Sequence, residues 1–293
     1  MKKWLLFIVA ACVVVLAACG NGQTEEKSAA ASKETKTVVA GTMVIVDILD
    51  KLGVDSVVGV PSSSTEMPAR YKDVKEIGNA MNPDMEIVKS LNPDVFISVT
   101  TLQDDIEPTA KSVNMNAEFV DLQGIPQLQQ TIRDLGKQFN REEQAEQLAS
   151  SYDQKLAEVK KFAADKKKPK VLAILGVPGS YLVATDHSYI GSLITAAGGE
   201  NAIQGPSEEY LASNTEYLQQ SKPDIILRLA HGMPDEVMKM FDKEFKTNTV
   251  WKHFDAVKND RVYDLSEPLF QTTANLQVDE ALDYLQDIFY EGQ

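Results

Sequence analysis

Short apolar runs alternate with amphipathic stretches along most of the chain. Residues 57–60, 95–99 and 171–175 are apolar runs of strand length, bounded by turn-forming residues. Between the strands, apolar residues recur at spacings of three and four, as in the segment 45–52, which stops at Gly53. Strands that alternate with helices predict an α/β fold with mostly parallel sheets.

The same pattern gives the remaining elements. We expect strands at 38–39, 117–120, 181–184, 225–227 and 261–264, and helices at 128–139, 189–197, 235–241 and 278–290. A further helix should begin at Asn82-Pro83, because Asn suits the N-cap and Pro the first helical position.

One phrase occurs twice, 130 residues apart. Glu86 is followed after six residues by Pro93-Asp94 and an apolar run, and Glu216 is followed in the same way by Pro223-Asp224. Each copy is typical of a short helix, a tight turn and a buried strand. The repeat predicts two similarly built lobes, and a cleft between lobes is a usual place for a small ligand.

A single long helix is predicted between the two copies. Residues 141–166 contain neither Gly nor Pro, and their apolar residues lie at helical spacing. We therefore expect a first lobe at 38–140, a linking helix at 141–168 and a second lobe at 169–293.

The N-terminal segment predicts export and lipid attachment. Residues 1–18 combine two lysines, an apolar stretch and small residues, as a signal peptide does. Cys19 follows Leu-Ala-Ala, a pattern that resembles a bacterial lipobox, although an ordinary secretory signal with an incidental Cys would also fit. We expect a lipidated Cys19 followed by a flexible tether over 19–37, because this segment is polar and poor in large apolar residues.

Composition narrows the function classes. No Cys follows Cys19, which excludes disulfides, thiolate metal sites and Cys nucleophiles from the body of the protein. The formal charge of −14 becomes −16 without Lys2 and Lys3, so binding to nucleic acid or to an anionic membrane surface is disfavoured. No G-x-S-x-G motif, zinc-hydrolase motif or phosphate loop occurs, and we predict a binding protein rather than an enzyme.

Two side chains stand out as candidate metal ligands. His231 lies four residues beyond Leu227, past the carboxyl end of a predicted strand, which is the edge where open α/β sheets bind ligands. Met81 lies among turn-forming residues just before the first-lobe helix. A loop His is commonly solvated and a Met commonly fills core space. Together, a Met and a His are also the axial ligands of haem iron in cytochromes c.

Several phrases carry a resemblance to a known family. They are Arg70-Tyr-Lys-Asp-Val74, the stretch from Gly176 to Asp186, Pro223–Leu229 with His231-Gly-Met-Pro234, and Trp251-Lys-His-Phe254. Through them the chain resembles the lipid-anchored substrate-binding proteins that feed siderophore, cobalamin and haem importers, and most of all the haem-binding members. The resemblance implies a class III substrate-binding protein: two Rossmann-like lobes with mostly parallel central sheets, joined by one long helix.

The resemblance also implies a haem site. In the family a Met and a His from opposite lobes ligate the iron, and Met81 and His231 stand at the matching positions. First-lobe backbone groups hold the haem propionates, which here implicates two segments, Thr42-Met43-Val44 and Ser63-Ser64-Thr65. The chain departs from the haem-binding pattern at Ser64-Thr65, where Tyr-Lys would be expected. An ordinary helix start and a polar turn would explain the same residues.

Partners follow from the same likeness. One surface Glu per lobe docks the family onto its permease, which implicates Glu86 and Glu216. A capping box with Ser213 accounts for Glu216 and the helix dipole for Glu86, but neither explains why both lobes carry the Glu at matching positions. We expect a monomer on the extracytoplasmic face of the cell membrane that passes haem to an ABC permease with a cytoplasmic ATPase, after receiving it from an upstream haem-relay surface protein. A ferric siderophore or cobalamin receptor on the same scaffold, or an adhesion or sensor module without a permease, are the alternatives.

Overall fold

The first lobe is built on a parallel sheet. A computed structural model describes residues 36–214, 218, 220–231 and 233–291. Within these residues, five strands pair in the order β3-β2-β1-β6-β7. All four pairings are parallel. The strands are β1 (Val38–Ala40), β2 (Val57–Val60), β3 (Lys75–Glu76), β6 (Val95–Val99) and β7 (Ala117–Val120).

Helices and one hairpin complete this lobe. The first sheet alternates with α1 (Met43–Leu52), α2 (Met85–Ser90), α3 (Gln103–Ser112) and α4 (Ile125–Gln138), with the short helices η1 (Ala69–Tyr71) and η2 (Thr100–Leu102). A hairpin of β4 (Gly78–Asn79) and β5 (Asn82–Pro83) precedes α2. Helix α3 was not predicted, because Pro108 and a polar composition make its sequence atypical of a helix.

The second lobe is built on a mixed sheet. Its strand order is β11-β9-β8-β12-β13, with β10 paired to β8. The strands are β8 (Lys170–Val177), β9 (Ser180–Ala184), β10 (Glu200–Asn201), β11 (Tyr210–Ala212), β12 (Ile225–Ala230) and β13 (Val262–Leu265). The central pairings of β12 with β8 and β13 are parallel, whereas β9 runs antiparallel to β8. The described helices are α6 (Tyr189–Ala196), α8 (Pro234–Thr247), α9 (Thr249–Lys252), α10 (Asp255–Lys258) and α11 (Val278–Tyr290).

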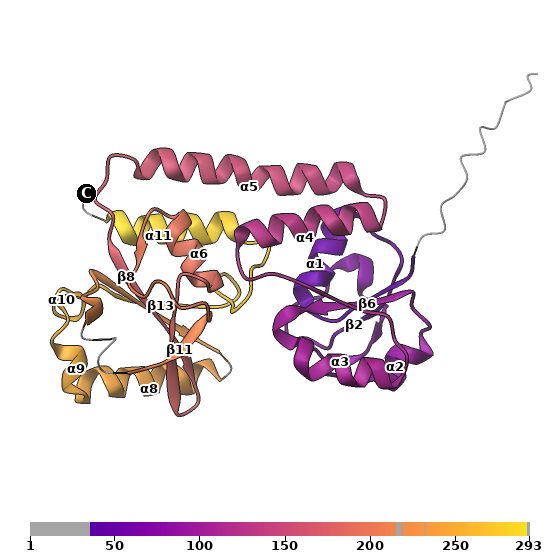
Figure 1. Cartoon of the computed structure of the whole chain (residues 1–293), viewed down its shortest axis with the longest axis horizontal. Helices are drawn as coiled ribbons and strands as arrows, with labels where there is room; N and C mark the ends of the chain where they lie inside the picture. The colour runs from indigo at the N-terminus through magenta and orange to yellow at the C-terminus, as the bar shows by residue number, and fades with distance from the viewer. Residues whose placement is uncertain (1–35, 215–217, 219, 232, 292–293) are drawn as a thin grey trace, which may run out of the picture. The chain divides into compact units, whose positions relative to one another are not determined.

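The predicted linking helix is present as α5 (Glu142–Ala163). It runs alongside α4 and α11 (Figure 1) and contacts α1 and α4 of the first lobe and α6 and α11 of the second. Gly136 permits the close approach of α4 to α5, because a Cβ there would lie 2.3 Å from the Cβ of Ala145. The helix therefore joins the two lobes by packing on both.

A continuous hydrophobic core follows this helix. One buried cluster includes Ile45 of α1, Leu128 of α4, Tyr152 of α5, Leu193 of α6 and Leu282 of α11. Separate clusters fill the far faces of the two sheets, beside α8 in the second lobe and beside α3 in the first. In the part of the chain that the structure describes, no helix is long and apolar enough to cross a bilayer.

The helix start predicted at Asn82-Pro83 is wrong. These residues form β5, and α2 begins after Asp84, whose carboxylate accepts the N–H groups of Glu86 and Ile87 at 3.0 Å each. Gly78, the first residue of β4, has a φ of +91°, a conformation that favours glycine. Asp84 is the better cap because its side chain reaches two free N–H groups of the helix.

Candidate functional site

The first lobe presents three loops at the carboxyl edge of its parallel strands. They are the start of α1 after β1, the loop after β2, and the β4–β5 hairpin after β3. The N–H of Ser62 donates to the carbonyl of Gly78 at 2.8 Å, which ties the second loop to the hairpin. The carboxyl edge of such a sheet is where ligands bind.

Helix α1 begins without a side-chain cap. Thr42 occupies the N-cap, but its hydroxyl makes no capping bond and is buried with no hydrogen-bond partner among the described residues. Gly41 lets the chain turn tightly here, because a Cβ would lie 2.9 Å from the carbonyl of Ile97. The first N–H groups of α1 therefore remain available to an anion such as a carboxylate.

The Ser-rich loop is exposed and folded on itself. Ser63, Ser64 and Thr65 are all exposed. The N–H of Thr65 donates to Oγ of Ser63 at 2.9 Å, and Oγ of Ser62 donates to the carboxylate of Glu76 at 2.8 Å. The loop can offer hydroxyl groups to a ligand at the same edge as α1.

Met81 is held at the tip of the β4–β5 hairpin. Its N–H donates to Oδ1 of Asn79 at 2.8 Å, and the residue is 62% exposed. The interpretation of Met81 as core filler is therefore wrong. Its thioether is accessible to a ligand, and thioether sulfur is a known axial ligand of haem iron.

His231 lies directly after β12, as predicted. Its N–H donates to the carbonyl of Gly176 on β8 at 2.9 Å, which extends the strand pairing by one residue, and the residue is exposed. Gly176 is required at this point because a Cβ would lie 2.3 Å from Val237 of α8. The backbone of His231 is thus fixed while its imidazole stays accessible.

An ion cluster lies beneath this loop. The guanidinium of Arg228 donates to both carboxylate oxygens of Asp264 at 2.5 and 2.7 Å and to Asp242 of α8 at 3.2 Å. It also lies 5.1 and 5.6 Å from the rings of Phe245 and Phe241. Burial disfavours the charged form, but the two carboxylates outweigh it and hold the pKa of Arg228 above its ordinary value. The cluster ties β12 and β13 to α8 on either side of the His231 loop.

Some of the predicted cleft residues line one cavity. Met43, Val44 and Thr65 face a cavity of about 340 Å³ whose opposite wall is formed by Pro268, Gln271, Asn275, Leu276, Gln277 and Glu280 of the second lobe. Thr42, Ser63, Ser64, Met81 and His231 do not line it. The structure thus brings three of the predicted residues together in one cavity and leaves the other five outside it.

The charge of this cavity is mostly negative. Asp47, Asp50 and Glu280 line it together with Lys51. The pKa of Asp47 is raised above its ordinary value, first by burial and then by the nearby charge of Asp50. The charge of Lys51 opposes this shift without cancelling it. A propionate would be repelled by this part of the wall, so the uncapped start of α1 is the more favourable carboxylate partner.

The segment 268–277 was not predicted to take part in the site. It follows β13 and carries several amides, but it has no periodic pattern that would predict an element. Asn275 fixes its shape by donating to the carbonyl of Pro268 at 3.0 Å and accepting the N–H of Gln277 at 2.8 Å. The edge rule that led to His231 could also have found this segment, because it begins at the carboxyl end of a neighbouring parallel strand.

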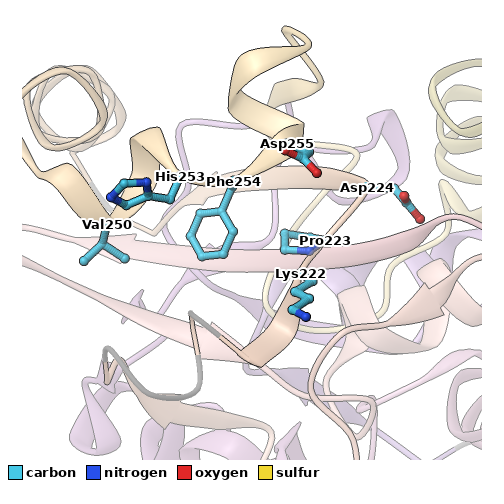
Figure 2. Close-up of a pocket in the computed structure, with 7 residues that line it drawn as sticks. All are labelled: Lys222, Pro223, Asp224, Val250, His253, Phe254 and Asp255. Atoms are coloured by element: carbon cyan, nitrogen blue, oxygen red, sulfur yellow. The ribbon is translucent and has the colours of Figure 1, made fainter.

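Larger cavities lie elsewhere. A cavity of about 550 Å³ lies before β12, at the opposite end of the strand from His231. Figure 2 shows it lined by Lys222, Pro223, Asp224, Val250, His253, Phe254 and Asp255. His187 lines a separate cavity of about 380 Å³ together with residues of α4 and α6. Neither of these histidines lies on the His231 loop.

Three other predicted features have different outcomes. Glu86 is exposed in the first turn of α2, where it can meet a partner or interact with the helix dipole. Glu216 and Cys19 lie outside the described residues. Within the described residues, no group of three or more His, Cys, Asp or Glu side chains could hold a metal ion.

Comparisons with known proteins agree with this architecture. Residues 38–269 match the model of the periplasmic binding protein family. The high-affinity haem uptake system protein IsdE of Staphylococcus aureus (strain Newman) is 50% identical over 259 residues, which cover 87% of this chain and 88% of that protein. The proteins that this chain matches are binding proteins rather than enzymes.

Two solved structures are also similar. An ABC transporter substrate-binding protein from Listeria monocytogenes EGD-e is 51% identical, with a TM-score of 0.84, covering 88% of this chain and all of that one. The S. aureus IsdE complex with haem is 49% identical, with a TM-score of 0.83, covering 87% of this chain and 99% of that one. The chain belongs to the periplasmic binding protein family.

Proposed function

We propose that this protein binds haem between its two lobes and delivers it to an ABC import permease for iron acquisition. The observation that carries the proposal is the near 50% identity, over most of the chain, to a protein whose solved structure contains haem. This likeness favours haem over a ferric siderophore or cobalamin as the cargo.

Met81 and His231 are proposed as the axial ligands of the haem iron. Each is exposed on a loop at the carboxyl edge of its own lobe's sheet, and each has its backbone N–H engaged by a fixed partner. A thioether and an imidazole form a ligand pair known from cytochromes c. The two side chains therefore have the chemistry, the accessibility and the anchoring that ligation requires.

The haem propionates are proposed to meet the first lobe at Thr42-Met43-Val44 and Ser63-Ser64-Thr65. The uncapped N–H groups of α1 and the hydroxyl groups of the Ser-rich loop support this assignment. The buried hydroxyl of Thr42, which has no partner among the described residues, is a further donor at the same place.

The remaining assignments concern location and transfer. We propose that residues 1–18 direct export, that Cys19 carries the lipid anchor and that 19–37 form a tether to lobes at 38–140 and 169–293, linked by 141–168. The monomer would thus face outward from the bacterial membrane, receive haem from a relay protein and dock on the permease, which works with its cytoplasmic ATPase, through Glu86 and Glu216.

The test is a titration of the purified protein with haemin, followed by absorption in the Soret and visible region. Wild type should give a six-coordinate spectrum, while Met81→Ala and His231→Ala should each change the band positions and weaken binding. His253→Ala is the matched control, because His253 is also exposed but lies in the cavity before β12. A wild-type protein that binds a ferric siderophore or cobalamin but not haemin would refute the proposal.

A further inference from the structure

Met233, two residues beyond His231, occupies a conformation that is costly for its residue type. Its φ of 44° and ψ of 55° are left-handed, a region that L-residues with long side chains rarely adopt. Six non-glycine residues described in the structure have a positive φ, and four of them are Asn or Asp, which tolerate it: Asn92, Asn114, Asn140 and Asp260. Met233 and Lys222 are the exceptions.

Met233 is also a poor choice for its place in the helix. It is the N-cap of α8, and its carbonyl accepts the N–H groups of Glu236 and Val237 at 3.0 and 3.1 Å. Its side chain makes no capping bond, whereas Asn, Asp, Ser or Thr could make one. The local backbone would therefore be served better by Asn.

The side chain is exposed despite being apolar. Among the described residues, four large hydrophobic side chains are exposed. Phe162 and Tyr284 pack on the rings of Tyr290 and Phe270. The other two are Met81 and Met233, at 62% and 55% exposure, and each lies on a loop that carries a proposed axial ligand.

The surroundings of the His231–Met233 loop are suited to an apolar ligand. Ala230 and Pro234, which flank the loop, line a cavity of about 270 Å³ with Met238 and Leu265 and with the polar residues Asp264, Ser266 and Glu267. Apolar side chains therefore make up part of the surface beside the loop, and the carboxylate of Asp264, which lines the same cavity, is paired with Arg228. A singly exposed apolar side chain is common on protein surfaces, so the exposure of Met233 counts here only together with its left-handed backbone and its missing cap.

From these observations we infer that Met233 contacts the porphyrin face of the haem on the His231 side, and that its apolar side chain shields the bond between His231 and iron from water. The inference rests on the proposed function. Strain, the missing cap and apolar exposure all disfavour Met at this position in the free protein, and contact with the ligand offsets them.

The experiment compares Met233→Asn with Met233→Leu in the full-length protein. Asn suits both the left-handed conformation and the N-cap, so its melting temperature without haem should rise by about 2 °C. Its haem should transfer to excess haem-free myoglobin about tenfold faster than from wild type, because one large apolar contact is lost. Leu keeps the apolar contact without sulfur, and its transfer rate should stay within about twofold of wild type.

Each contrary result is decisive. A Met233→Asn protein that retains haem as well as wild type would overturn the contact. A Met233→Leu protein that loses haem as fast as Met233→Asn would show that sulfur, not apolar surface, is what matters. Wild type and His231→Ala are measured in the same series. A wild type without a haem spectrum would refute the proposed function itself. A normal wild-type spectrum together with an unchanged rate of haem transfer from Met233→Asn would refute only the contact.

Discussion

Replacing Arg228 by Ala should destabilise the second lobe more than the removal of a single surface ion pair would. Arg228 is 8% exposed and joins β12, β13 and α8 through three hydrogen bonds to carboxylates. Removing one member of a buried ion pair costs about 3–5 kcal/mol when the partner charge stays buried. Here the side chains of Asp264 and Asp242 are 48% and 56% exposed, so water can solvate them after the change.

The expected loss is therefore at the lower end, about 3 kcal/mol in the free energy of unfolding. Arg228→Lys keeps the charge but loses the bidentate geometry, and we expect it to cost about 1–2 kcal/mol. Urea unfolding followed by circular dichroism measures both.

Arg133→Ala is the matched control. Arg133 also makes two hydrogen bonds to one carboxylate, that of Glu146, at 2.9 and 3.2 Å, but its side chain is 30% exposed and that of Glu146 61%. Such an exposed pair contributes about 0–1 kcal/mol. If Arg228→Ala costs no more than Arg133→Ala, the argument that burial makes the Arg228 cluster important is wrong.

Three further predictions concern other parts of the molecule. Gly176→Ala should displace α8 and the His231 loop, because the new Cβ would lie 2.3 Å from Val237. We expect the free energy of unfolding in urea to fall by about 1–3 kcal/mol and haem binding to weaken. A variant as stable as wild type would contradict the close packing of Gly176 against α8. The pKa of Glu209 is raised, chiefly by burial and further by the charge of Asp121, although its hydrogen bond with Gln123 at 2.8 Å acts in the opposite direction. The ionised carboxylate therefore destabilises the fold above that pKa, and this penalty disappears as the pH falls through it. Glu209→Gln should therefore raise the melting temperature at pH 7.5 but not at pH 4, with Glu208→Gln as the control; an equal gain at both pH values would refute the assignment. Glu86→Ala should leave haem affinity unchanged while reducing haem uptake by cells, and normal uptake would remove Glu86 from the proposed docking surface.

Much of the fold could be predicted because strands and helices differ in periodicity. The buried strands and the long helix α5 carry strong apolar patterns, and the linking helix predicted at 141–168 appears as Glu142–Ala163. The start of α2 was mispredicted, because Asn82-Pro83 has good capping chemistry but hairpin formation with Gly78-Asn79 takes precedence. Tertiary pairing of this kind is invisible to a local reading.

The site was less predictable than the fold. His231 could be found because it follows a clear strand, and Met81 because turn residues surround it. The conformation of Met233 could not be found, because it depends on a backbone angle. The amide-rich segment 268–277 has no periodicity, so only its position after a parallel strand could have indicated it. Residue type and order predict which side chains can bind, whereas the shape of the wall opposite them comes from packing.

The most direct test of the central claim is the absorption spectrum of the haemin complex of wild type, Met81→Ala, His231→Ala and the double variant. We predict six-coordinate haem in wild type, a changed spectrum in each single variant, and loss of high-affinity binding in the double variant. Identical spectra and affinities in all four proteins would contradict the claim that sulfur and imidazole from the two lobes hold the iron.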